Sequence, residues 1–104
     1  MVIIRKGDYG HNLNFTVTES DGTTAVDLTD ATIVFKMARH RATTNKIESD
    51  CTITVAADGT CYYTLVLGDT DTAGVYRAEL QLTWATPKVL TAKLETIKIV
   101  ADLP

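Results

Sequence analysis

The chain has 104 residues, the usual size of one domain and too few for two independent cores, so we expect a single domain over residues 1–104. Hydrophobic residues make up 45% and charged residues 22%, a balance typical of folded proteins that excludes a disordered chain. The net charge of −3 provides no basic field for phosphates or anionic lipids, so no nucleic acid and no membrane is expected as a partner.

No apolar run approaches the roughly 18 residues of a transmembrane helix. The apolar patch at the N-terminus, Val2-Ile3-Ile4, is too short for a signal peptide. We therefore expect the newly made chain to be a cytoplasmic product.

Short strands are the predicted elements throughout, because segments between turn signals are rich in Thr, Val, Ile and Tyr and alternate with period two. In chain order they cover residues 2–5, 12–18, 32–38, 51–55, 61–65, 75–84 and 90–99, with 51–55 expected as the hairpin partner of 32–38. Turn signals separate them, as at Ser20-Asp21-Gly22 and Ala85-Thr86-Pro87. About seven short strands at this spacing predict an all-β, immunoglobulin-like antiparallel β-sandwich, with a β-barrel as the alternative.

The last predicted strand changes parity along its length. In the last strand, Leu90, Ala92 and Leu94 share a parity that Ile97 and Ile99 do not, so we expect a β-bulge near Glu95-Thr96.

The two cysteines, Cys51 and Cys61, flank a predicted three-residue turn at Ala57-Asp58-Gly59. That turn places Val55 opposite Cys61 and Cys51 opposite Leu65. The sulfurs would then lie roughly 13 Å apart, too far for a disulfide, so both are expected to be reduced core residues.

The sequence contains few residues at the spacings that catalytic or metal-binding sites need. His11 and His40 are the only histidines, and neither has a cysteine or carboxylate at metal-ligand spacing. Residues 68–74 contain Asp69 and Asp71, as calcium loops do, but lack the closing glutamate. We favour a structural turn there, with Asp and Thr side chains capping backbone amides before a sharp bend at Gly74. We expect no cofactor, no metal and no enzymatic activity.

Two regions are candidates for interaction. Arg39 and Arg41 lie in a basic loop, residues 39–46, that either contacts an acidic partner or is solvated. Trp84 is either a lid on the end of the core or an exposed aromatic anchor, and its parity with Leu80 and Leu82 favours the lid.

Gly74 followed by Tyr76 at the start of a strand resembles the tyrosine corner of immunoglobulin-like domains, in which the phenol bonds back to the backbone of the corner. In true immunoglobulin domains an Asp stands four residues before the Tyr and a Cys two after it. Here Thr72 and Ala78 occupy those positions, and Asp71 stands one place earlier. The likeness predicts a structural corner of Asp71, Gly74 and Tyr76 without the inter-sheet disulfide.

Five segments carry a second resemblance over nearly the whole chain. They are Ile4-Arg5-Lys6-Gly7-Asp8, Val26-Asp27-Leu28-Thr29-Asp30-Ala31-Thr32-Ile33-Val34-Phe35, Gly68-Asp69-Thr70-Asp71 to Gly74-Val75-Tyr76, Glu79-Leu80-Gln81-Leu82-Thr83-Trp84, and Ile97-Lys98-Ile99 to Leu103-Pro104. In order and spacing they resemble the N-terminal domain family of phage baseplate upper proteins and related tailed-phage immunoglobulin-like modules.

That family implies a β-sandwich in a virion, usually in its tail or baseplate, that contacts other structural proteins. Members often continue into domains that hold a receptor-binding protein, whereas this sequence stops just after its last strand, as expected of a stand-alone or accessory virion subunit or a fragment.

The leading hypothesis is therefore a non-enzymatic phage virion protein that assembles with other virion proteins or with copies of itself. The alternative is a carbohydrate- or host-receptor-binding module that uses Trp84 or Tyr62 as a stacking platform. An enzyme is a distant third.

Overall fold

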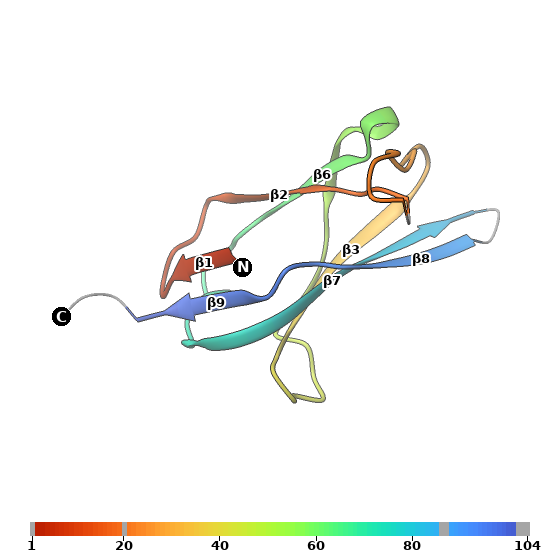
Figure 1. The fold of residues 1–104 in the computed structure, drawn as a ribbon. Helices are drawn as coiled ribbons and strands as arrows, with labels where there is room; N and C mark the ends of the chain where they lie inside the picture. Colours follow the sequence, from red (N-terminus) through yellow and green to blue (C-terminus); the bar gives the residue numbers. More distant parts are fainter. Residues whose placement is uncertain (1, 20, 86–87, 102–104) are drawn as a thin grey trace.

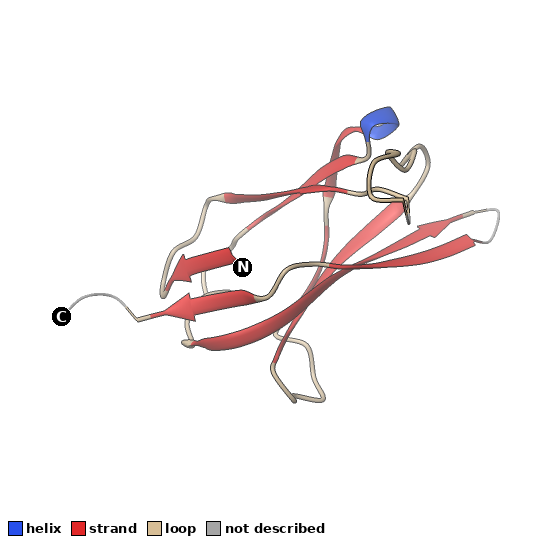
Figure 2. Cartoon of the chain, viewed as in Figure 1, coloured by secondary structure: helices blue, strands red, loops and turns tan. Residues whose placement is uncertain are grey.

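Two β-sheets form the architecture of the chain, which the computed structural model describes for residues 2–19, 21–85 and 88–101 (Figure 1). The strands of these residues are β1 (Val2–Arg5), β2 (Asn12–Thr16), β3 (Thr32–Arg39), β4 (Ile47–Asp50), β5 (Thr52–Val55), β6 (Thr60–Thr64), β7 (Gly74–Trp84), β8 (Lys88–Lys93) and β9 (Ile97–Val100). A short 3-10 turn, η1 (Ala56–Asp58), is the one helical element of the described residues (Figure 2).

The strand order is that of an immunoglobulin-like sandwich. The larger sheet runs β1-β9-β7-β3-β4, with β8 also paired to β7, and the smaller sheet runs β2-β6-β5. In immunoglobulin domains the last, sixth and third strands neighbour one another in one sheet, and the second and fifth do so in the other. The predicted all-β sandwich is confirmed.

The core lies between the two sheets, and period-two alternation produces it. In β7, Tyr76, Ala78, Leu80 and Leu82 are all buried, as the alternation with Arg77, Glu79 and Gln81 predicts. Across the layer, the Phe35 ring stacks between Phe15 and Tyr63, with centroid distances of 5.4 and 5.1 Å. Each such aromatic pair adds about 0.5–1.5 kcal/mol to the stability gained from area burial.

Three details of the predicted strands were wrong. The described residues form nine strands, because 47–50 is a separate strand and the last strand is divided into β8 and β9. β5 does not pair with β3; the chain crosses to the smaller sheet at Cys51, whose amide still bonds to Ile33 of β3 at 2.8 Å. β1 runs parallel to β9, so the larger sheet is mixed, because no hairpin turn connects these two strands and dictates their direction.

The bulge in the last strand is confirmed. β8 pairs with β7 in one register, in which Glu79 faces Lys93, and β9 resumes with Tyr76 facing Ile97. Two residues of β7, 77 and 78, therefore lie opposite three residues, 94–96, of the segment that joins β8 to β9. The extra residue restores the inward orientation of Ile97, which is buried.

The predicted register of the β5–β6 hairpin was wrong, because the residue opposite Cys61 is Ile53 and not Val55. The connection between the two strands consists of η1 and Gly59, so Val55 faces Thr60. A shift of register between Ile53 and Val55 then places Ile53 opposite Cys61. Cys51 consequently lies diagonally across from Cys61 and contacts it. A hydrogen bond to the Cys61 thiol, together with burial, raises the pKa of Cys51, and the same bond lowers the pKa of Cys61. Both thiols are free.

Three sequence features fall outside the described residues. They are Ser20 in the first turn signal, Thr86 and Pro87 in the turn after Trp84, and the terminal Leu103-Pro104 of the family resemblance.

Candidate functional site

The tyrosine corner forms at the start of β7. The hydroxyl of Tyr76 donates a hydrogen bond of 2.7 Å to the carbonyl oxygen of Thr72, and the ring is 1% exposed. Gly74 lies beneath the side chain of Arg39, whose Nε would be 3.2 Å from a Cβ at that position. The corner therefore brings Gly74 and Tyr76 together with the end of β3.

Asp71 belongs to the corner, and its main partners are the side chains of Lys46 and Thr72. Its carboxylate accepts a hydrogen bond of 2.6 Å from Lys46 Nζ and one of 3.0 Å from the Thr72 hydroxyl. These bonds, with Lys46 the larger cause, lower the pKa of Asp71. Asp71 thus ties the basic loop to the corner through a surface ion pair.

Two neighbouring residues, Asp69 and Thr70, perform the capping expected of this segment. Asp69 accepts hydrogen bonds from the Val66 amide at 2.9 Å and from the Tyr63 hydroxyl at 2.5 Å. Burial, assisted by that bond, raises the pKa of Tyr63. The carboxylates of Asp69 and Asp71 therefore turn to different partners and do not converge as calcium ligands do.

Thr70 ties this segment to the loop that follows β1. Its hydroxyl donates to the Asp8 carbonyl at 2.7 Å and accepts from the Gly7 amide at 3.1 Å, and the residue is 1% exposed. The sequence contains no signal that distinguishes Thr70 from Thr72, because both follow an Asp in the same short run.

The basic loop is a surface feature joined to the corner. Arg39 pairs across the sheet with Tyr76, and the His40 amide bonds to the Val75 carbonyl at 2.9 Å. Arg41 is exposed and has a φ of 67°, a left-handed conformation that costs a non-glycine residue about 1–2 kcal/mol. Arg39 and Arg41 therefore lie beside the corner.

Trp84 lies at the opposite end of β7. Trp84 is eight residue steps along β7 from Tyr76, a distance of about 26 Å, so the structure does not bring Trp84 and the basic loop together. The indole is half-buried against the core, and Lys88 Nζ lies 4.8 Å from the ring centroid. Both contacts agree with a lid on the core.

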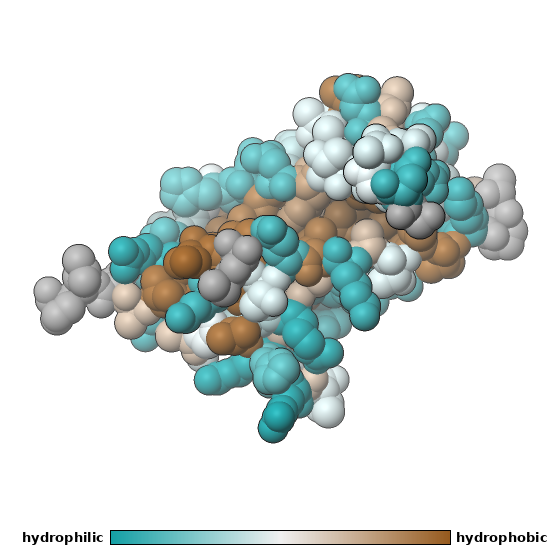
Figure 3. Space-filling view, in the orientation of Figure 1, coloured by the Kyte–Doolittle hydropathy of each residue, from teal (hydrophilic) through white to brown (hydrophobic). Residues whose placement is uncertain are grey.

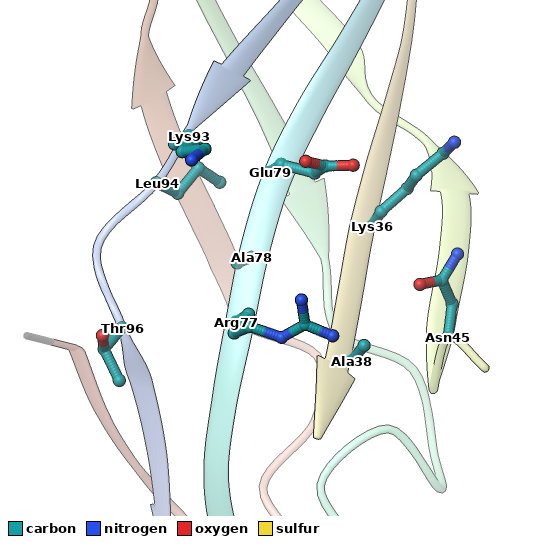
Figure 4. Close-up of a pocket in the computed structure, with 9 residues that line it drawn as sticks. All are labelled: Lys36, Ala38, Asn45, Arg77, Ala78, Glu79, Lys93, Leu94 and Thr96. Atoms are coloured by element: carbon teal, nitrogen blue, oxygen red, sulfur yellow. The ribbon is translucent and has the colours of Figure 1, made fainter. Parts of the chain in front are cut away.

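A shallow hollow of about 280 Å³ lies on the outer face of the larger sheet, beside the break between β8 and β9 (Figure 4). Arg77 and Glu79 extend from β7 across the sheet toward β3, and Lys93 lies on the other side of β7. The Arg77 guanidinium donates to the Ala42 carbonyl at 3.1 Å. With Lys36 also on its rim, this is a polar, mainly basic surface whose lining includes no histidine or cysteine.

A more apolar groove of about 500 Å³ opens between the two sheets (Figure 3). Leu13 and Phe15 of β2 form one wall, and Leu94 and Ile97 form the other, with Val2 at one end. β1 pairs with β9 from Val2 onward and covers the space between the sheets there. The groove is the stretch of that space that β1 does not cover. Figure 3 shows apolar side chains reaching the surface in this gap.

β2, which forms one wall of this groove, is also an open edge. In the smaller sheet β2 pairs with β6 on one side only, and the described residues place no strand on its other side. The amide of Val17 bonds to Gly59, and the carbonyl of His11 accepts from Leu65. The odd-numbered residues of β2 therefore bond to β6, whereas the amides and carbonyls of Asn12, Asn14 and Thr16 point outward.

The described part of the chain contains no group of three or more His, Cys, Asp or Glu side chains that could hold a metal ion. Within the same residues no helix is long and apolar enough to cross a membrane. A comparison with protein-family models found no match to this chain, and a comparison with curated proteins also found none.

Proposed function

We propose that this chain is a non-enzymatic structural module of a tailed-phage virion, placed in the tail or baseplate and made in the cytoplasm of the bacterial host. Its partners are other virion structural proteins and copies of itself. The observation that carries the proposal is the open backbone edge of β2 beside an apolar groove. Such an edge is a ready template for another chain. The five-segment resemblance supports the virion context.

The architecture supports binding better than chemistry. The hollow of Figure 4 has a polar, mainly basic lining with no histidine or cysteine, and the two thiols contact each other at the smaller sheet. The proposed activity therefore lies in surfaces and strand edges.

Carbohydrate binding by Trp84 or Tyr62 is less well supported. A stacking platform needs an open aromatic face, whereas Trp84 is half-buried with Lys88 over its ring, and Tyr62 is also half-buried. Among the residues that the structure describes, no surface feature favours this second function.

The test is to locate the chain in particles. Phage virions induced from the strain that carries the gene are purified by density-gradient banding, and an antibody raised against the purified chain is used for immunogold electron microscopy. Label on tails or baseplates, with the chain's peptides in the banded particles, supports the proposal. A chain that stays in the soluble lysate and is missing from banded particles overturns it.

A further inference from the structure

Strand edges invite uncontrolled pairing, and proteins block them with charges, bulges or prolines. The described residues leave five edges, on β1, β4, β5, β8 and β2. Four of them are blocked: β1 by Arg5, β4 by Glu48 and Asp50, β8 by Lys88 and Lys93, and β5 by the register shift between Ile53 and Val55. β2 alone, Asn12-Leu13-Asn14-Phe15-Thr16, has no charge, no proline and a continuous register.

The unblocked edge is symmetric about its middle residue. Asn14 is the central residue, Leu13 and Phe15 flank it with half-buried apolar side chains, and Asn12 and Thr16 flank those with exposed polar ones. A twofold axis through an edge strand makes two copies antiparallel. A second copy of the same strand therefore presents apolar residues opposite apolar residues and polar residues opposite polar ones.

We infer that β2 pairs antiparallel with β2 of a second copy, about a twofold axis at Asn14. This inference rests on the proposed assembly function and names one partner of the β2 edge. Asn14 faces Asn14 of the second copy, and each Asn12 faces the other copy's Thr16. The three facing pairs make two hydrogen bonds each, six in all, and use every outward amide and carbonyl of β2.

The same register fills the groove. In each copy, Leu13 and Phe15 point to the inner side of the smaller sheet, toward Leu94 and Ile97. In the dimer, Phe15 of the second copy lies opposite Leu13, and Leu13 of the second copy lies opposite Phe15. These side chains project over the gap that β1 leaves open, and the two smaller sheets join into one continuous sheet.

The first measurement is the solution mass by light scattering, from about 1 μM to about 1 mM, a range chosen for an interface of modest size. The unmodified chain is expected to approach a dimer at the upper end. Asn14→Pro removes an outward amide without touching the β6 ladder, so its fold should remain while its dimer dissociation constant rises about tenfold or more. Asn14→Ala keeps the amide and should dimerise like the unmodified chain.

The second measurement is amide hydrogen exchange on the unmodified chain, which needs no variant to fold. The amides of Asn12, Asn14 and Thr16 should exchange slowly at high concentration and fast on dilution, whereas the Val17 amide, which bonds to Gly59, should be slow throughout. A chain that is monomeric up to about 1 mM overturns the inference, as does an unchanged dimer in Asn14→Pro. The virion-labelling experiment does not depend on either result, so the two proposals fail separately.

Discussion

The Tyr76 hydroxyl and the Thr72 carbonyl oxygen are joined by a hydrogen bond of 2.7 Å at the corner where the chain enters β7. Tyr76 is 1% exposed, so the bond satisfies a polar group that the core would otherwise leave without a partner. The corner is held further by Asp71, which accepts from Lys46 in the basic loop. These two interactions therefore hold the start of β7, the longest strand of the larger sheet, in place.

Replacing Tyr76 by Phe should lower the free energy of unfolding by about 1–2 kcal/mol, because it removes this hydrogen bond and keeps the ring. Urea unfolding followed by circular dichroism measures the change. Tyr9→Phe is the matched control, since Tyr9 is 56% exposed and should show no change. Equal midpoints for Tyr76→Phe and the unmodified chain would contradict a stabilising corner.

Gly59→Ala should destabilise the fold far more than Gly22→Ala. Both glycines have positive φ, 70° and 76°, so both substitutions carry the left-handed cost of about 1–2 kcal/mol. A Cβ at Gly59 would also lie 2.5 Å from the Val17 carbonyl oxygen and 2.9 Å from that of Val26, whereas the space at Gly22 is open. Thermal or urea unfolding of the two variants isolates this contact, and equal losses would argue against it.

Mild oxidation should join Cys51 and Cys61 within one chain, because their thiols already contact each other across the β5–β6 hairpin. With oxidised glutathione, one thiol attacks the reagent, forms a mixed disulfide and releases one molecule of glutathione. The second thiol then displaces the bound glutathione, so the protein loses two hydrogen atoms and two molecules of glutathione are released in all. Mass spectrometry without reductant measures the product. In Cys51→Ser this product cannot form. Two thiols that still alkylate after oxidation would refute the contact.

Acid should remove the stabilisation that the Asp21 carboxylate provides. This carboxylate accepts bonds from the Thr24 hydroxyl at 2.6 Å and from the Thr24 and Thr23 amides at 2.9 Å, which lower the pKa of Asp21 to about 2. Since the folded pKa is below the unfolded value of about 3.9, the contribution is complete above that value and disappears as the pH falls to about 2.

The measurement for Asp21 is the urea midpoint as a function of pH for the unmodified chain and for Asp21→Asn, which keeps an acceptor but cannot ionise. The two stabilities should differ near neutral pH and converge toward about pH 2. Asp58→Asn is the control, because no donor of the described residues bonds to Asp58. A constant difference across this pH range would contradict the stated origin of the Asp21 shift.

Local periodicity predicted the parts of this fold that depend on one strand at a time. The inward row of β7, the buried residues of β3 and the bulge before Ile97 all follow from side-chain parity, because a strand with one buried face must alternate. The tyrosine corner was also predictable, since Gly74 and Tyr76 are close in sequence.

Parts of the candidate site could not be predicted in this way. Asp69, Thr70, Asp71 and Thr72 alternate the same residue types, and only the path of the chain decides that Asp69 and Thr70 cap while Asp71 pairs with Lys46. β4 escaped prediction because an edge strand buries little, and only Ile47 of its residues is buried.

The sequence by itself determined that the protein is all-β and which residues of its alternating strands face the core, whereas the choice of a sandwich over a barrel needed the structure. The tertiary structure alone decided the pairing between strands: the contact of Cys51 with Cys61, the parallel position of β1 beside β9, and the open edge of β2. The physical reason is that alternation is a local consequence of the pleat, whereas register and edges depend on backbone hydrogen bonds between segments far apart in the chain.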